Sequence, residues 1–264
     1  MNQYSYLEIT RRSNSLFLAI NRPEVHNAFD QRLIGELTEF FDSAGELQDI
    51  RTIVLTGKGR TFCAGADLSM MKDAAEFDYE QNVAEAESIF DLMMAVNSCP
   101  KAVIGRINGS AIGGGAGLVC CCDIAVAVDR AKFSFSESRL GLVPAIISPF
   151  VIAKIGESNA RELFLTGERF DAYHAQKIGL VHHVVGEDSL EITINNRISE
   201  LHMAAPGAQI AAKELIQKSH SMHSPAARDR LSRTIALRRN SDEGIEGMSA
   251  FLDKRLPSWQ EESE

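Results

Sequence analysis

The sequence lacks the features of a membrane or exported protein. Its 264 residues contain no apolar run near the ~18–20 residues that a membrane-spanning helix needs. The longest candidate, residues 116–128, is interrupted by Asp123. The first ten residues are polar and lack the apolar segment of a signal peptide. These absences predict a soluble, cytoplasmic protein with no membrane partner.

Positive charge is also scarce. The chain has 27 lysines and arginines against 36 aspartates and glutamates, so its formal net charge is −9. Proteins that bind nucleic acid usually present a basic face. We therefore expect no nucleic-acid partner, although a local cluster such as Lys58 and Arg60 still suits an anionic small ligand.

Motifs of metal sites and of covalent catalysis are missing too. There is no paired C-x-x-C motif, no H-x-x-x-H motif with a carboxylate partner and no G-x-S-x-G motif. Three of the five cysteines are consecutive, at residues 120–122, which does not suit a disulfide framework. We expect no metal, and reduced cysteines that pack as small apolar side chains.

The apolar pattern predicts an α/β protein in which strands concentrate in the first two-thirds and helices in the last third. Alternating or continuous apolar segments indicate strands, and apolar residues at helical spacing indicate helices. The predicted strands are a hairpin over residues 6–20 and segments 52–56, 102–107, 124–128 and 132–135. The predicted helices are 28–47, 83–97, 116–122, 144–155, 158–166, 172–178, 190–203, 206–219, 226–239 and 243–255.

Two glycine-rich segments could hold an anion or a developing oxyanion. Residues 57–68 (G-K-G-R-T-F-C-A-G-A-D-L) combine glycines with small residues that let a ligand approach the backbone. Residues 108–117 (N-G-S-A-I-G-G-G-A-G) precede an apolar helix, whose first N–H groups are unpaired. This second segment does not fit the dinucleotide-binding pattern G-x-G-x-x-G. Taken alone, both segments also fit tight turns and close helix–strand packing.

Glu137 is a third candidate. It follows the predicted strand 132–135, and a residue just past a strand end often projects into a crevice of an α/β fold. The alternative is a solvated loop carboxylate that pairs with Arg139.

The order and spacing of five segments resemble the crotonase (enoyl-CoA hydratase/isomerase) superfamily over nearly the whole chain. They are N-R-P-E-V-H-N-A-F at 21–29, F-C-A-G-A-D-L at 62–68, I-N-G-S-A-I-G-G-G at 107–115, C-D-I-A-V-A at 122–127 and F-S-F-S-E-S-R-L-G-L-V-P at 133–144. The resemblance implies a spiral of ββα units over residues 1–200. It also implies a helical C-terminal trimerisation region over residues 201–264, and hence a homotrimer or a dimer of trimers.

The resemblance also implies roles for particular residues. The backbone N–H groups of Ala66 and Gly114 would bind the thioester carbonyl of an acyl-CoA substrate, and Glu137 would transfer protons. Because coenzyme A arrives as part of the substrate, no cofactor is expected. Its predicted contacts are Glu24, Val25, His26, Ala64, Asp67, Leu68, Lys254 and Arg255. Candidates for the acyl pocket, which also suit a core, are Met70, Met71, Phe90, Met94, Ile147 and Phe150.

Gly117 departs from the pattern and is therefore counted among the catalytic positions. Hydratases of this superfamily typically use two glutamates, and Gly117 stands where one of them is expected. Paired carboxylates orient water and move its proton, and glycine can do neither. Three interpretations stay open: a hydratase in which Glu137 works alone, an isomerase in which one base shuttles one proton, and a non-catalytic relative that binds coenzyme A.

A closer resemblance favours the hydratase. Segments 141–151 (G-L-V-P-A-I-I-S-P-F-V), 165–172 (L-T-G-E-R-F-D-A) and 250–259 (A-F-L-D-K-R-L-P-S-W) resemble bacterial methylglutaconyl-CoA hydratases of leucine breakdown and related isohexenylglutaconyl-CoA hydratases. The expected reaction is reversible addition of water to a branched dicarboxylic enoyl-CoA such as 3-methylglutaconyl-CoA.

Overall fold

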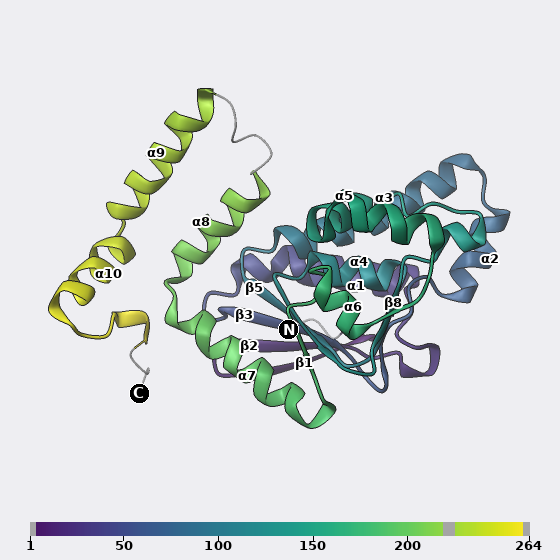
Figure 1. Cartoon of the computed structure of the whole chain (residues 1–264), viewed down its shortest axis with the longest axis horizontal. Helices are drawn as coiled ribbons and strands as arrows, with labels where there is room; N and C mark the ends of the chain where they lie inside the picture. Colours follow the sequence, from purple (N-terminus) through teal and green to yellow (C-terminus); the bar gives the residue numbers. More distant parts are fainter. Residues whose placement is uncertain (1–3, 219–224, 261–264) are drawn as a thin grey trace.

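The computed structural model describes residues 4–218 and 225–260, and it contains two sheets with helices packed around them (Figure 1). The larger sheet has the strand order β1-β2-β3-β5-β7-β10 and the smaller sheet β4-β6-β8-β9. The strands are β1 (Leu7–Arg12), β2 (Ser15–Ile20), β3 (Thr52–Gly57), β4 (Thr61–Cys63), β5 (Ala102–Ile107), β6 (Ser110–Ile112), β7 (Ile124–Val128), β8 (Lys132–Ser134), β9 (Phe170–Asp171) and β10 (His183–Val185). The α-helices are α1 (Gln31–Ser43), α2 (Leu68–Glu76), α3 (Tyr79–Ser98), α4 (Gly114–Cys121), α5 (Ser148–Thr166), α6 (Ala172–Lys177), α7 (Glu187–Met203), α8 (Pro206–Gln217), α9 (Pro225–Arg239) and α10 (Asp242–Asp253).

From β3 to β8, consecutive strands alternate between the two sheets. Strands β3, β5 and β7 pair in parallel in the larger sheet, and the strands that follow them, β4, β6 and β8, pair in parallel in the smaller one. Each strand pair is followed by helix: α2 and α3, then α4, then α5. This repeat confirms the predicted spiral of ββα units.

The central strands are buried along their whole length because both of their faces are covered. All six residues of β2 and all six of β3 are buried, as is usual for parallel strands between helical layers. Helix α1 packs into the same core and begins at Asp30, whose side chain accepts a hydrogen bond from the Leu33 N–H at 2.8 Å.

Helix α4 is buried within the molecule. Its residues from Gly115 to Cys121 are all buried, and it contacts both α3 and α5. A helix that is apolar on every side fits such a position. Because α4 follows directly after β6, its N-terminus lies at the end of the smaller sheet.

The sequence patterns missed the shortest elements and misplaced one helix start. Strands β4 and β6 lie within the two segments interpreted as glycine-rich loops, and α2, β9 and β10 were not predicted. The predicted helix start at Pro144 is wrong. Residues 144–147 are not helical, with a turn directly before α5, which begins at Ser148. The break between the helices predicted over 144–155 and 158–166 is present, because non-helical backbone at Gly156 (φ 77°) divides α5 into two helical segments. The predicted helix end at Ser219 lies outside the described residues.

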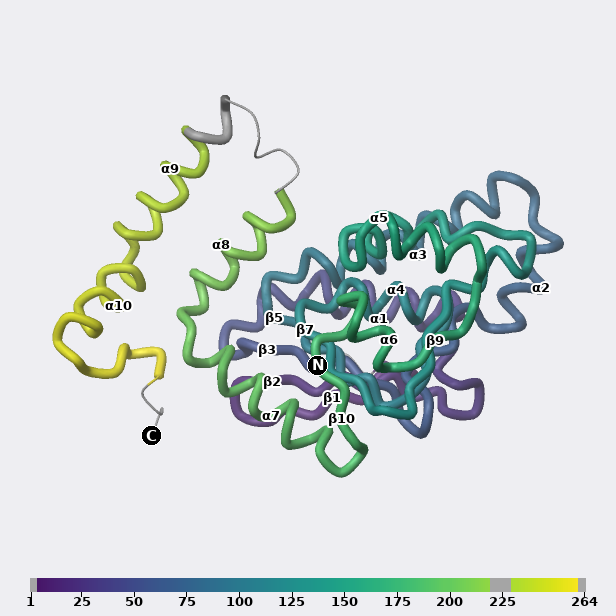
Figure 2. The backbone as a smooth tube through the Cα atoms, viewed as in Figure 1, coloured from purple at the N-terminus to yellow at the C-terminus, as the bar shows by residue number. Residues whose placement is uncertain are grey.

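Helices α8, α9 and α10 extend away from the two sheets, and Figure 2 shows the chain path through them. Arg51 fixes the chain just before them by donating hydrogen bonds to the carbonyl oxygens of Leu201 and His202 at the end of α7. The predicted domain division at residue 200 stays a prediction; that residue lies in the last turn of α7. No helix within residues 4–218 and 225–260 is long and apolar enough to cross a membrane.

Candidate active site

A mostly apolar cavity of about 240 Å³ lies between the N-terminus of α4, the loop before α2 and the turn before α5. Its lining includes Ala66, Gly114 and Glu137, so the structure brings these three predicted residues together. Of the six side chains expected in the acyl pocket, Met70, Met71 and Ile147 line this cavity. The other three do not, namely Phe90, Met94 and Phe150.

The N–H groups of Ala66 and Gly114 have no acceptor among the described residues. The Phe29 N–H donates to the Gly65 carbonyl (2.7 Å) and the Asp67 N–H donates to the Phe29 carbonyl (2.8 Å), so a short parallel bridge holds the chain on both sides of Ala66. Within the described chain, the N–H groups of Ala66 and Gly114 donate to no residue. Gly114 is also the first residue of α4, where the helix dipole favours negative charge. Such donors suit the oxygen of a polarised thioester carbonyl.

Two glycines let these donors approach each other. Gly65 has φ +85°, and a Cβ added there would lie 2.7 Å from the Ile112 carbonyl oxygen and 3.5 Å from the Gly114 nitrogen. A Cβ added at Gly114 would lie 2.8 Å from the Phe29 ring. Larger residues at either position would therefore force the two loops apart.

Glu137 lies beside the start of α4. A Cβ added at Gly113 would lie 3.3 Å from Glu137 Oε1. Glu137 Oε2 is buried and has no hydrogen-bond partner among the described residues. Burial raises the pKa of Glu137, partly offset by a hydrogen bond from its own N–H. A raised pKa suits a carboxyl group that both accepts and returns a proton.

The alternative pairing of Glu137 with Arg139 is wrong. Arg139 Nε instead donates a hydrogen bond to the Thr166 carbonyl oxygen at 2.9 Å. The Glu137 carboxylate is therefore not neutralised by its neighbour in the sequence.

Ile147 occupies the space in which a side chain at Gly117 would have to lie. A Cβ added at Gly117 would be 2.4 Å from Ile147 Cγ2 and 3.1 Å from Ile147 Cβ. Ile147 is itself only 3% exposed and lines the cavity. Among the described residues that line the cavity, Glu137 is the one ionisable side chain. The position of the expected second carboxylate is thus closed by an apolar side chain.

The residues expected to contact coenzyme A fall into two groups. The first group lies near the cavity: the His26 carbonyl accepts a hydrogen bond from the Ala64 N–H (3.1 Å), Ala64 lines the cavity, and Leu68 is 76% exposed at the start of α2. Glu24 and Val25 belong to the short 3-10 helix Pro23–Val25 directly before His26. Asp67 differs from the others because its side chain is buried, outside the cavity lining, and begins α2 by accepting the Ser69 N–H (2.9 Å).

The second group, Lys254 and Arg255, follows α10 at the end of the molecule opposite α2 (Figure 1). Arg255 forms a double hydrogen bond with Glu246 at 2.6 and 2.8 Å. These residues do not line the cavity of their own chain, and their predicted contact with coenzyme A would have to occur in a neighbouring subunit.

Comparison with known proteins agrees with this geometry. The family model for enoyl-CoA hydratase/isomerase matches residues 11–262. The chain belongs to this family. A 2,3-dehydroadipyl-CoA hydratase of Escherichia coli is 32% identical over 258 residues, which cover 97% of this chain and 99% of that protein. An enoyl-CoA hydratase of Alternaria alternata is 35% identical over 90% of this chain and 79% of its own.

Solved structures support the same conclusion. The crystal structure of an enoyl-CoA hydratase from Shewanella pealeana superposes with a TM-score of 0.93 at 36% identity, covering 97% of both chains. The fold is therefore the crotonase fold, and family membership supports enoyl-CoA hydratase activity at the level of the family.

Sequence reasoning missed two residues at this site, Arg22 and Phe29. Phe29 brackets Ala66 with its backbone and packs its ring against Gly114. Arg22 is 8% exposed and pairs with Asp67. Both residues lie in the segment N-R-P-E-V-H-N-A-F. The available signal was an arginine two residues after Ile20, the end of the predicted hairpin.

Proposed function

We propose that this enzyme adds water across the α,β double bond of an enoyl-CoA thioester with Glu137 as its single proton-transfer group. The carbonyl oxygen of the thioester accepts hydrogen bonds from the N–H groups of Ala66 and Gly114. The reaction is reversible and uses no cofactor beyond the coenzyme A of the substrate.

The chemistry follows from where charge develops. The ionised Glu137 takes a proton from water as the water oxygen bonds to Cβ. The electron pair of the double bond moves toward the carbonyl oxygen, where the two N–H groups and the start of α4 stabilise the negative charge. Glu137 then gives the proton to Cα and is ionised again, so the net change is addition of one water molecule.

One observation supports this proposal most strongly. The Glu137 carboxylate lies in the same small apolar cavity as the two free N–H groups, while Ile147 closes the place of a second carboxylate. A single carboxylate that serves first as base and then as acid is sufficient for the addition. The same arrangement also suits an isomerase, which moves one proton between two carbons.

For the acyl group, the sequence favours a branched dicarboxylic enoyl-CoA such as 3-methylglutaconyl-CoA. One relative is named as a hydratase of a dicarboxylic substrate, 2,3-dehydroadipyl-CoA. The lining formed by the described residues contains no lysine, arginine or histidine that could neutralise a second carboxylate. That apolar lining favours a different substrate, a branched enoyl-CoA whose acyl group has no terminal carboxylate.

A matched pair of substrates separates these possibilities. 3-Methylglutaconyl-CoA and 3-methylcrotonyl-CoA share the branched double bond and differ by the terminal carboxylate. We expect hydration, followed as loss of the conjugated thioester absorbance, with at least one of them. A preference of tenfold or more in kcat/KM corresponds to about 1.4 kcal/mol and identifies the acyl class.

Two control substrates test the other interpretations. Crotonyl-CoA tests an unbranched chain, and a 3-enoyl-CoA tests isomerisation, because its product gains the conjugated absorbance. Binding of all four thioesters without reaction would contradict the proposed activity and leave a non-catalytic coenzyme A-binding protein.

We also propose that the chain assembles as a homotrimer or a dimer of trimers through its C-terminal helices. Support comes from apolar side chains that α9 and α10 leave exposed, among them Leu237 (72%), Phe251 (82%) and Leu252 (76%). Sedimentation equilibrium of the full chain tests this, since a monomer at micromolar concentration would contradict it.

A further inference from the structure

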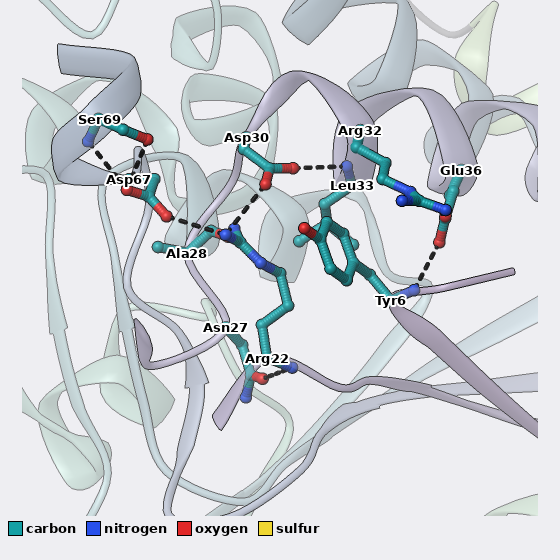
Figure 3. A network of polar contacts seen from close by, with 10 residues as sticks. All are labelled: Tyr6, Arg22, Asn27, Ala28, Asp30, Arg32, Leu33, Glu36, Asp67 and Ser69. Atoms are coloured by element: carbon teal, nitrogen blue, oxygen red, sulfur yellow. Dashed lines mark hydrogen bonds and ion pairs between the residues drawn. The ribbon is translucent and has the colours of Figure 1, made fainter. Parts of the chain in front are cut away.

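Arg22 joins the two loops that surround the oxyanion-binding residue Ala66. Its Nη1 donates to the Ala28 carbonyl oxygen at 2.6 Å, and its Nη2 contacts Asp67 Oδ2 at 3.1 Å and Asp30 Oδ2 at 3.0 Å. Figure 3 shows the guanidinium between these groups, with the two carboxylates at the starts of separate helices, α1 and α2. The ion pairs are well shielded, because the Arg22 and Asp67 side chains are only 10% and 11% exposed.

Each partner of Arg22 stands next to a residue that holds Ala66. Ala28 and Asp30 flank Phe29, whose N–H and carbonyl oxygen bond to Gly65 and Asp67 on either side of Ala66. Asp67 directly follows Ala66 in the chain. The guanidinium therefore fixes both segments of the parallel bridge, the one around Phe29 and the one that carries the Ala66 N–H.

The loop that Arg22 begins is also held in an uncommon backbone conformation. His26 and Asn27 both have φ +57°, which is unusual for residues other than glycine. The Asn27 side chain is fully buried, accepts the Arg22 N–H (2.9 Å) and donates to the carbonyl oxygens of Lys58 and Thr61. Strained backbone of this kind persists where surrounding contacts fix it and is frequent at functional sites.

We propose that Arg22 is a positioning residue that holds the Ala66 N–H against the thioester carbonyl oxygen. This inference rests on the proposed function, because the role of Ala66 is part of it. Removal of one oxyanion donor costs a factor of ~10²–10³ in kcat. Arg22 does not touch the substrate, so its loss displaces the donor rather than removing it, and a smaller effect of ~10-fold or more is expected.

Three variants test this inference. Arg22→Met removes the guanidinium, and Arg22→Lys keeps the charge but cannot reach the carbonyl and both carboxylates at once. Asp67→Asn removes one ion pair yet keeps an oxygen that can begin α2, since asparagine is as good an N-cap residue as aspartate. Asp67→Asn therefore serves if Arg22→Met does not fold.

The matched control is Asp171→Asn. Asp171 is likewise the N-cap residue of a helix: it begins α6 by accepting the His174 N–H, three residues further on, at 2.8 Å, whereas Asp67 accepts the N–H two residues further on. Asp171 does not line the cavity. The same substitution at another N-cap aspartate thus separates loss of a helix cap from loss of positioning.

Two readouts are needed. The first is kcat and KM for hydration. The second is the infrared stretching frequency of the carbonyl group in bound butyryl-CoA labelled with carbon-13, a saturated thioester that cannot be hydrated. Hydrogen bonds from Ala66 and Gly114 lower this frequency relative to free butyryl-CoA.

We expect Asp67→Asn and Arg22→Lys to lower kcat ~10-fold or more, with KM changed less than ~3-fold, and Arg22→Met to lower it further. The carbonyl frequency should rise toward its value in solution in all three, while Asp171→Asn matches the wild type in both readouts. If the three variants lose thermal stability but keep the wild-type kcat and frequency, Arg22 only stabilises the fold and the inference is wrong. A wild-type protein that does not shift the carbonyl frequency overturns the oxyanion role of Ala66 itself.

Discussion

Replacing Gly117 by alanine tests whether Ile147 really closes the place of a second carboxylate. Alanine is favoured over glycine in a helix interior by ~1 kcal/mol. The added Cβ would lie 2.4 Å from Ile147 Cγ2, and overpacking of this kind costs ~1–3 kcal/mol. We therefore expect Gly117→Ala to change stability by ~0–2 kcal/mol in the unfavourable direction.

The sign should reverse when Ile147 is shortened. Ile147→Ala removes Cγ2 and by itself costs ~2–5 kcal/mol, because it leaves a cavity. In that background the alanine at position 117 meets the remaining Cβ of residue 147 at 3.1 Å and the flexible end of Met93 (Cε) at 3.4 Å, and it keeps its helical advantage. Gly117→Ala should then stabilise the protein by ~1 kcal/mol, which gives a coupling of ~1–3 kcal/mol between the two positions.

Thermal unfolding followed by circular dichroism measures this cycle. In a domain of this size 1 kcal/mol corresponds to about 2–4 °C in Tm. Fluorescence is less suitable, because the single tryptophan, Trp259, lies beyond α10 and donates a hydrogen bond to the Met203 carbonyl oxygen at the end of α7, not to α4. Equal effects of Gly117→Ala in both backgrounds would show that the two side chains do not compete for space, and the explanation of the missing carboxylate would be refuted.

Three further predictions concern Glu137 and the cysteines. Because burial raises the pKa of Glu137 and the ionised form begins the reaction, the acid limb of kcat/KM should have its midpoint above the ~4.3 of a free glutamate; a midpoint at or below that value contradicts the burial. Because the pKa of Glu137 is higher in the folded than in the unfolded protein, the folded state binds the carboxyl proton more tightly, and this stabilisation is lost as pH rises through the folded pKa. Glu137→Gln should therefore raise Tm at pH 7.5. A Tm difference that persists below pH ~4, where the carboxyl group is protonated in both states, would argue for another cause. All five cysteines are buried, and burial raises the pKa of Cys63, Cys120 and Cys122 to about 12. A thiol reagent at pH 8 should therefore modify none of the five in the native protein and all five after denaturation. Rapid labelling of the native protein would contradict this packing.

Long periodic elements were predictable from the sequence because their patterns repeat over several turns. The amphipathic helix α1 and the apolar strand β2 fall within their predicted ranges, and β3 extends one residue beyond its predicted range of 52–56. The three-residue strands β4 and β6 are too short for any period, and glycine dominates the signal around them. The turn at residues 144–147 was misinterpreted because proline also suits the start of a helix.

The site was predictable where it depends on backbone and not where it depends on packing between distant segments. Ala66, Gly114 and Glu137 could be named because they lie in motifs with fixed spacing. The contact between Gly117 and Ile147 joins positions 30 residues apart on α4 and before α5, and no local pattern reveals it. The same holds for Arg22 and Asp67, whose pairing across 45 residues gives Asp67 a structural role that its place in the motif does not suggest.

The most direct test of the single-carboxylate mechanism is the turnover of Glu137→Gln. The substitution preserves the shape of the side chain and removes its ability to accept a proton. We predict that kcat for the preferred enoyl-CoA falls by ~10²–10⁴, the contribution typical of general acid–base catalysis, while the Kd for butyryl-CoA stays within ~3-fold of the wild type. A variant that keeps more than a tenth of the wild-type kcat would contradict the mechanism, because another group would then be moving the proton.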